Sequence, residues 1–299
     1  MIELFLSYEP LINQVMVYAI LAYSQYVVLR AGVFSVATVA VASIGAYTSA
    51  IATTRYGIPP FFATLLSMLL GLITGLLIAL PLARLRGVYQ AIATIGLVQV
   101  VVSLTMYFES LTGGVLGFNN IPKGYGTLGF AVALALVIYF LHCLGRSGTS
   151  RAFDAIRQDE TVAVSLGISV QRHHLIAFAV SGVLAGLAGS LIAFYSRSLF
   201  PAQFGFHLLT EVLAFVVLGG STAVVGPLIG AAVLIVVPDF ARPLADNTLL
   251  FYGVVLIVVM IYLPHGVADT IAMRWARTRQ ARSLRELDAE RGKDVVAVP

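Results

Sequence analysis

Charged side chains are scarce in this sequence. Asp, Glu, Lys and Arg make up 11% of its 299 residues, and hydrophobic residues make up 59%, whereas about a quarter of an ordinary soluble domain is charged. A chain of this composition cannot keep most of its surface in water. It is predicted to be an integral membrane protein.

Cysteine is nearly absent too. Cys143 stands alone, so no disulfide can form within the chain, and its place inside an apolar run predicts a small buried side chain. The first ten residues contain Glu3 and Glu9 but neither Lys nor Arg, so they lack the basic start of a secretory signal. The first apolar segment is therefore expected to remain in the protein as a helix.

Several motifs of enzymes are also missing. The sequence has no G-x-x-x-x-G-K-[ST] run to cradle phosphates and no G-x-S-x-G nucleophile turn, so it cannot hydrolyse ATP by a P-loop mechanism on its own. His173 and His174 are adjacent and point about 100° apart on a helix, which favours an interfacial anchoring role over a metal pair. We expect no catalytic residue, no metal site and no cofactor.

What the sequence has in abundance is long apolar segments. They cover residues 10–29, 31–54, 61–83, 87–108, 128–145, 174–196, 207–238 and 247–263. A helix needs roughly 20 mostly apolar residues to cross a bilayer. The predicted fold is therefore all-α, a polytopic bundle of about 8 to 10 membrane segments.

The segment 207–238 is too long for one crossing. As a single helix it would measure about 48 Å, against a hydrocarbon layer of roughly 30 Å. Gly219, Gly220 and Pro227 supply a break, because paired glycines loosen a helix and proline suits a new first turn. Two short or half-spanning helices are predicted beside the pathway, since broken backbone is tolerated there only where protein or a water-filled cavity satisfies it.

Basic residues predict the orientation. They gather in two loops and the tail, as Arg84 and Arg86, then Arg146, Arg151, Arg157 and Arg172, and finally Arg274, Arg277, Arg279, Arg282, Arg285, Arg291 and Lys293. All three regions should be cytoplasmic, and this explains the net charge of +4 better than a nucleic-acid partner, which we do not expect. An even number of crossings must then follow residue 173. The N-terminus should lie outside, unless segment 31–54 is re-entrant.

The polar stretch from Gly145 to His174 is the longest interruption between apolar segments. Within it, residues 159–167 predict a short helix with Asp159 and Glu160 in its first turn and Gly167 as its stop. Val162, Ala163 and Leu166 can offer a small apolar face. Such a helix is either a contact site for a cytoplasmic partner or a solvated loop helix.

A few polar residues inside apolar segments are candidates for the pathway. Glu211 lines the pathway, holds the broken backbone or lies near the outer interface beside His207, since a mid-membrane charge costs roughly 2.5 to 3.5 kcal/mol. Gln99 and Ser103 either face the pathway or bond a neighbouring helix, and the latter is favoured. Tyr18, Tyr23 and Tyr26 could line a path but suit packing better. Glycines four residues apart predict close helix packing at Gly71 and Gly75, Gly182 and Gly186, and Gly226 and Gly230.

Several stretches, in order, resemble the LivM-type branched-chain amino acid permease family up to about residue 265. Gly32-Val33-Phe34-Ser35 with Gly45-Ala46-Tyr47 is similar to its G-x-x-S-x-G-x-A-x-x-x-x-G-A-Y segment, with Ala37 in place of the second glycine. Further matches are Leu85-Arg86-Gly87-Val88-Tyr89, Leu111-Thr112-Gly113-Gly114, Ala155-Ile156-Arg157-Gln158-Asp159-Glu160 and Leu218-Gly219-Gly220 with Gly226-Pro227. The importer signature E-A-A-x-x-x-G is degenerate here, because Thr161-Val162-Ala163 stands in the place of its triplet.

The resemblance implies a permease subunit of an ABC importer in the bacterial inner membrane. It implies a transmembrane domain at 1–265 with a cytoplasmic coupling loop at 146–173, while the basic residues predict a cytoplasmic tail at 266–299, either an amphipathic helix or partly disordered. The coupling role rests on the whole loop, and the residues predicted for contact with the ATPase are Asp159, Glu160, Ala163, Leu166 and Gly167. The residues predicted for the pathway are Ser35, Tyr47, Gln99, Glu211, Gly219 and Gly220.

The implied partners are a homologous permease, two ATP-binding subunits, an outside solute-binding protein and membrane lipid. The cargo would be branched-chain or related amino acids, or instead urea or another small organic solute. Two other functions remain open from the residues: an ion-coupled secondary transporter, for which Glu211 is the sole intramembrane proton carrier, and a membrane scaffold without a pathway.

Overall fold

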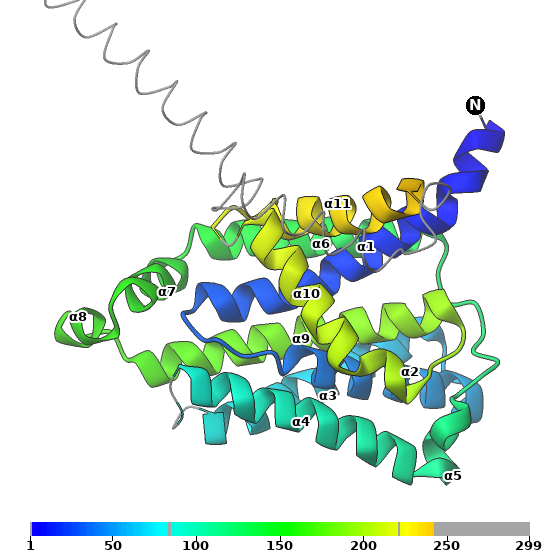
Figure 1. Cartoon of the computed structure of the whole chain (residues 1–299), viewed down its shortest axis with the longest axis horizontal. Helices are drawn as coiled ribbons and strands as arrows, with labels where there is room; N and C mark the ends of the chain where they lie inside the picture. The colour runs from blue at the N-terminus through cyan, green and yellow to red at the C-terminus, as the bar shows by residue number, and fades with distance from the viewer. Residues whose placement is uncertain (1, 83–84, 86, 221, 242–299) are drawn as a thin grey trace, which may run out of the picture.

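The computed structural model describes residues 2–82, 85, 87–220 and 222–241, with side chains described from residue 8 to residue 236 of these ranges (Figure 1). Its longer helices are α1 (Ile2–Arg30), α2 (Thr38–Tyr56), α3 (Pro60–Leu82), α4 (Val88–Tyr107), α6 (Thr127–Gly145), α7 (Gly148–Gln158), α9 (Val170–Ser196), α10 (Phe206–Gly219) and α11 (Gly226–Ala241). Shorter ones are α5 (Glu109–Thr112), α8 (Glu160–Ser165) and the 3₁₀ turns η1 (Gly114–Leu116) and η2 (Pro201–Phe204). The predicted all-α fold is confirmed.

Five of the described helices are long and apolar enough to cross a membrane, namely α1 from Tyr8 onward, α3, α4, α6 and α9. The helices α10 and α11 are shorter apolar helices, and α2 is not among the five despite its 19 residues. The predicted segment 247–263 and the tail 266–299 lie outside the described residues.

The start of α2 differs from the sequence prediction. We expected a helical segment from residue 31, but residues 31–37 form an irregular stretch after Gly32, whose φ is +80°, and α2 begins only at Thr38. The apolar character of this stretch reflects burial rather than helix, since Val33, Ser35 and Val36 are each at most 4% exposed. A true connection therefore separates α1 from α2.

Helix α9 lies at the centre of the bundle, where it packs against α1, α2 and α3. The approach is close because glycine replaces side chains at the crossings, as predicted: a Cβ on Gly71 would lie 2.3 Å from the carbonyl oxygen of Gly182, and one on Gly45 would lie 2.8 Å from Gly186. The Ser67 hydroxyl also donates a 2.9 Å hydrogen bond to the Gly45 carbonyl, joining α3 to α2. Helices α2, α3 and α9 therefore form a tightly packed core.

The predicted break in segment 207–238 is confirmed. Helix α10 ends at Gly219, Gly220 takes a φ of +105°, and α11 begins at Gly226 and packs against α10 and α1. At 1.5 Å per residue the two helices measure about 21 and 24 Å. Each is shorter than the hydrocarbon layer, and together they form a helical hairpin.

The two ends of the bundle carry different elements. Helices α7 and α8 project from one end, where α3 also ends and α4 begins, while α5 lies at the opposite end (Figure 1). The loops that the sequence assigned to the cytoplasm therefore share one end of the molecule. We refer to it as the α8 end.

One residue prediction was wrong. Cys143 is exposed rather than buried, because α6 is a peripheral helix whose buried face consists of Phe130, Leu134, Val137 and Leu141. The neighbours of Cys143 in the sequence are apolar because the outer side of α6 is predominantly apolar, like its buried side.

Candidate functional site

The polar stretch between α6 and α9 folds into a pair of helices at the α8 end. Helix α7 is amphipathic, with Ala152, Phe153 and Ile156 buried against the bundle and Arg151 and Arg157 exposed. The sequence predicted only a partly helical excursion here. The α7–α8 pair thus has one side fixed to the membrane helices and one side open.

Both ends of α8 are capped. The Asp159 carboxylate accepts hydrogen bonds from the N–H groups of Thr161 (2.7 Å) and Val162 (3.1 Å). At the other end Gly167 takes a φ of +80°, its N–H donates to the Val164 carbonyl, and the N–H of Ile168 donates to Ala163. This is a Schellman motif, so the predicted short helix with its glycine stop is confirmed.

The Asp159 carboxylate is stabilised by these contacts. The backbone N–H groups of Val162 and Thr161 hold the pKa of its carboxyl below the ordinary value, because their hydrogen bonds stabilise the charged carboxylate more than the protonated acid. The cap is therefore fully ionised at neutral pH.

Two exposed apolar side chains lie on one side of α8 and its C-cap. Val162, Val164 and Leu166 are 54%, 58% and 71% exposed, whereas Ala163 is completely buried. Val162 and Leu166 are four residues apart and therefore lie on the same side of the helix, while Val164 points to the opposite side. The sequence prediction placed Ala163 on the contact face with Val162 and Leu166, and only the latter two are available there.

Two of the predicted pathway residues lie inside the bundle. The Ser35 carbonyl accepts a 2.6 Å hydrogen bond from Gln25 of α1, whose other amide atom accepts from Thr38 of α2 at 2.7 Å. Tyr47 is 4% exposed, and its ring centroid lies 6.4 Å from that of Phe204 in η2. Both residues are buried in this conformation and meet no open surface.

Gln99 and Ser103 occupy the exposed side of α4, opposite its buried residues Thr94, Val98 and Val102. No hydrogen bond joins the Gln99 side chain to the part of the chain that the structure describes. The sequence favoured a bond to a neighbouring helix, and the helices described offer none. An amide near the middle of a membrane helix needs a polar partner from elsewhere.

The exposed side of α10 lies beside that of α4. Helix α4 contacts both η2 and α10, and the two helices face the viewer together in Figure 1. On α10 this side carries Phe206, His207 and Thr210. We refer to the exposed residues of these two helices as the α4–α10 face.

Glu211 stands at the margin of this face. Its side chain is 23% exposed, and its Oε2 lies 4.0 Å from Nδ1 of His207, one turn earlier. The contact matches the pairing with His207 considered from the sequence. Glu211 is thus partly shielded by its own helix rather than fully buried in an apolar core.

Gly219 and Gly220 lie at the turn of the α10–α11 hairpin and are buried. In the turn the Thr222 carbonyl accepts a 3.1 Å hydrogen bond from the Tyr26 hydroxyl of α1. Tyr23 and Tyr26 are 0% and 2% exposed. The tyrosines therefore serve packing, as the sequence favoured, and Tyr26 in addition supports the turn.

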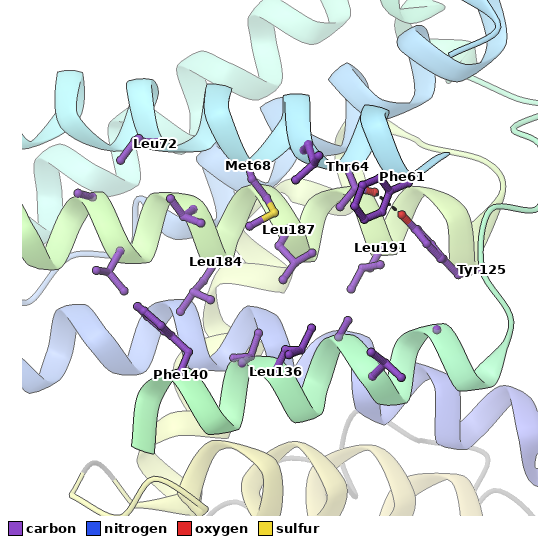
Figure 2. Close-up of a pocket in the computed structure, with 18 residues that line it drawn as sticks. Phe61, Thr64, Met68, Leu72, Tyr125, Leu136, Phe140, Leu184, Leu187 and Leu191 are labelled. Atoms are coloured by element: carbon purple, nitrogen blue, oxygen red, sulfur yellow. Dashed lines mark hydrogen bonds between the residues drawn. The ribbon is translucent and has the colours of Figure 1, made fainter. Parts of the chain in front are cut away.

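A large groove opens on another side of the bundle, between α3 and α6 with α9 as its floor (Figure 2). It has a volume of about 730 Å³ and an almost wholly apolar lining that includes Met68, Leu136, Phe140 and Leu187. Thr64 and Tyr125, whose hydroxyl oxygens lie 2.9 Å apart, are the polar groups at one end. The groove contains no charged side chain to recognise a zwitterion, so it suits hydrocarbon rather than an amino acid.

Comparison with known families decides what the chain is. The family described as the permease component of branched-chain amino acid transport systems matches residues 7–263. The chain belongs to this family. The family and the apolar helices make the permease a multi-pass protein of the inner membrane.

Individual relatives of the permease come from several transport systems. It is 31% identical over 259 residues to the high-affinity branched-chain amino acid transport system permease protein LivM of Escherichia coli, covering 75% of this chain and 61% of the relative. It is 28% identical over 256 residues to the ribose import permease protein RbsC of Haemophilus influenzae, covering 77% and 76%. The permease thus spans about 61% of the length of the LivM relative. No solved structure matches it.

The permease brings together two sets of predicted residues and separates others. Asp159, Glu160, Leu166 and Gly167 lie together on α8 or its caps, and Gln99 and Glu211 lie on or beside the α4–α10 face. Ser35 and Tyr47 are buried behind that face. Residues that sequence reasoning missed are Arg30 and Asp154, which form an ion pair between α1 and α7.

Proposed function

We propose that the permease is the membrane subunit of an ABC importer and forms part of a translocation pathway for branched-chain or related amino acids. A homologous permease completes the pore, two ATP-binding subunits close on ATP at the cytoplasmic side, and an outside binding protein delivers the solute. The pathway opens alternately to the two sides. Residues 146–173 act as the coupling loop.

The observation that carries this proposal is the pair of exposed apolar side chains on one side of α8, Val162 and Leu166. The helix is capped at both ends, so a partner that moves these two side chains moves the whole helix. It lies at the end of the molecule where the arginine-rich loops place the cytoplasm. A groove on an ATP-binding subunit is the partner that this surface fits.

The α4–α10 face supports a second subunit. The Gln99 side chain has no hydrogen-bond partner among the described residues and would be costly against lipid, but it is satisfied by a facing permease or by water in a pathway between the two. Gly219 and Gly220 then place the hairpin turn close to that pathway. Ser35 and Tyr47 would support it from behind.

The scarcity of charge in the described membrane helices supports a pore that binds its cargo weakly. Affinity then resides in the binding protein, and the cargo is an amphipathic solute that needs no fixed counter-ion. Relatives named for branched-chain amino acids and for ribose show why the cargo itself must be measured.

The test is uptake of labelled leucine into vesicles that contain the permease with its candidate partner permease, ATP-binding subunits and binding protein, with and without internal ATP. The informative variant is Gly167→Pro. Proline fixes φ near about −65° and lacks the N–H, whereas Gly167 has a φ of +80° and donates to Val164. The last turn of α8 should unwind.

The matched control is Gly148→Pro in the same loop. Gly148 is the first residue of α7, where proline is tolerated, and a Cβ there meets nothing within 4 Å. We expect ATP-dependent uptake in the wild type and in Gly148→Pro, and its loss in Gly167→Pro with assembly intact. Uptake driven by an ion gradient without ATP would replace the importer by a secondary transporter, and ATPase stimulation by ribose or urea alone would change only the cargo.

A further inference from the structure

Three polar contacts join α7 to the turn of the α10–α11 hairpin through the end of α1. Arg30 donates from Nε and Nη2 to the two carboxylate oxygens of Asp154, each at 3.2 Å. Its Nη1 donates to the Tyr26 hydroxyl at 3.1 Å, and that hydroxyl donates to the Thr222 carbonyl at 3.1 Å. The contacts thus run from Asp154 to Thr222 without interruption.

The first contact is a two-point ion pair at the surface of the bundle. The Arg30 side chain is 16% exposed and that of Asp154 is 48% exposed, so water screens the charges in part and the geometry of the pair matters more than its charge. The two-point geometry fixes the guanidinium plane and leaves Nη1 directed at Tyr26. A lysine could not make all three bonds in this geometry.

Backbone packing also holds α7 to the end of α1. After Arg30 the chain turns at Gly32, and a Cβ on Gly32 would lie 3.2 Å from the Cα of Arg157 in α7. Phe153 and Ile156 of α7 are 2% and 5% exposed against the bundle. A displacement of α7 therefore cannot leave the end of α1 where it is.

The last contact reaches the point at which the membrane backbone is broken. Thr222 lies in the turn between α10 and α11, and its carbonyl accepts the bond from Tyr26. Tyr26 is 2% exposed, whereas Thr222 is exposed, so the bond ties the outer side of the turn to the buried part of α1. Loss of this bond would remove a contact that holds the turn to α1, which favours a different arrangement of the turn.

We propose that Arg30 is a positioning residue that couples the α7–α8 pair to the α10–α11 turn through Tyr26. When α8 is displaced by its ATP-binding partner, the guanidinium moves with Asp154 and changes the support of the turn beside the pathway. This inference rests on the proposed function for its role in transport. The mechanical linkage itself does not depend on the cargo.

The first experiment measures the linkage directly, by hydrogen exchange in the assembled importer in lipid nanodiscs. Asp154→Asn weakens the pair at α7, and the amides of residues 220–226 should exchange about fivefold to tenfold faster although Asp154 does not touch them. Arg172→Gln is the control, since it removes an exposed charge at the same end of the molecule. Unchanged exchange at 220–226 in Asp154→Asn would overturn the proposal.

The second experiment compares uptake with ATP hydrolysis. Arg30→Gln removes the central residue of the path but could prevent assembly. Tyr26→Phe removes one oxygen and keeps the ring, so this variant carries the test in either case. We expect Tyr26→Phe and Asp154→Asn each to lower the solute imported per ATP about fivefold, with stimulated ATP hydrolysis retained. The double variant should be no worse than either alone, because both interrupt one path.

The outcomes separate this inference from the proposed function. Additive losses in the double variant, or a normal ratio of uptake to hydrolysis in Tyr26→Phe, would sink the linkage while the importer stands. A wild-type complex without ATP-dependent uptake would instead remove the proposed function, and the hydrogen-exchange result would then decide whether the linkage alone remains.

Discussion

Glu211 is the described residue that best separates the candidate mechanisms. Its carboxylate is partly exposed beside His207 at the margin of the α4–α10 face. A proton-coupled transporter would need this group to gain and lose a proton in each cycle. An importer driven by ATP needs no change in the protonation of Glu211 and uses at most the polarity of its side chain.

We therefore expect Glu211→Gln to keep at least about half of the ATP-dependent uptake, because the amide preserves shape and hydrogen bonding without the charge. His207→Gln is the matched variant on the same helix face. Uptake by proteoliposomes at fixed internal ATP measures both. Complete loss in Glu211→Gln alone, with normal assembly, would point to a titrating carboxylate in the transport step.

Asp159 makes the stability of α8 depend on pH in one direction. Its folded-state pKa is lowered by the N–H groups of Val162 and Thr161, so the cap stabilises α8 at pH values above the ordinary aspartate range and is lost as pH falls through the lowered value. We expect the exchange protection of the Thr161 and Val162 amides, relative to Asp159→Asn, to disappear only in acid. Equal protection of the two proteins at every pH would contradict this role.

Individual residues were predictable where the sequence marks local geometry. Gly167 follows a short apolar helix, and its role as a stop needs no tertiary information. The bond between Arg30 and Asp154 spans 124 positions, and that between Tyr26 and Thr222 spans 196. Such pairs depend on which helices become neighbours, and nothing in the residue pattern states this. Cys143 and Ala163 were misplaced for the same reason, because burial depends on the face that packs.

At the scale of elements, length and turn residues carried most of the prediction. The break between α10 and α11 follows from a run too long for one crossing together with Gly219, Gly220 and Pro227. Helix α7 was foreseen only in part, since its apolar positions Ala152, Phe153 and Ile156 are few and lie among polar residues. The start of α2 was misjudged because an apolar, buried connection has the composition of a helix.

The α10–α11 hairpin depends on direct contact between its two backbones. A Cβ on Gly230 would lie 1.9 Å from the Phe215 carbonyl oxygen, and backbone there cannot yield as a flexible side chain would. Gly230→Ala should therefore lower the free energy of unfolding by about 1–3 kcal/mol, seen as a lower midpoint in thermal unfolding of the detergent-purified chain. Gly96→Ala, where a Cβ meets nothing within 4 Å, should leave the midpoint unchanged or raise it. Equal midpoints for Gly230→Ala and the wild type would show that the hairpin can separate without cost.

At the scale of the whole molecule, two exposed sides differ in chemistry. The groove between α3 and α6 is apolar, whereas the α4–α10 face carries Gln99 and Ser103 among apolar side chains such as Ile92, Val100 and Leu104. Lipid suits the groove, but it offers the Gln99 amide no hydrogen-bond partner. The second permease is accordingly expected on the α4–α10 face.

Cross-linking tests this arrangement. In a Cys143→Ser background, Gln99→Cys should be protected from maleimide or cross-linked to the partner permease on assembly, and exposed when the chain is alone. Val98→Cys, one residue away and 1% exposed, should react in neither state. Equal labelling of Gln99→Cys before and after assembly would place the partner elsewhere.

The enclosure of α2 also bears on how the protein is made. Thirteen of its residues are buried by neighbours that include α3 and α9, and it is not among the helices apolar enough to cross a membrane by themselves. When α2 leaves the ribosome, α9 has not yet been synthesised. Transfer of α2 alone into lipid is only weakly favourable. In the nascent chain, contacts with α1 and α3 must therefore keep α2 in the bilayer until α9 has been synthesised and packs against it.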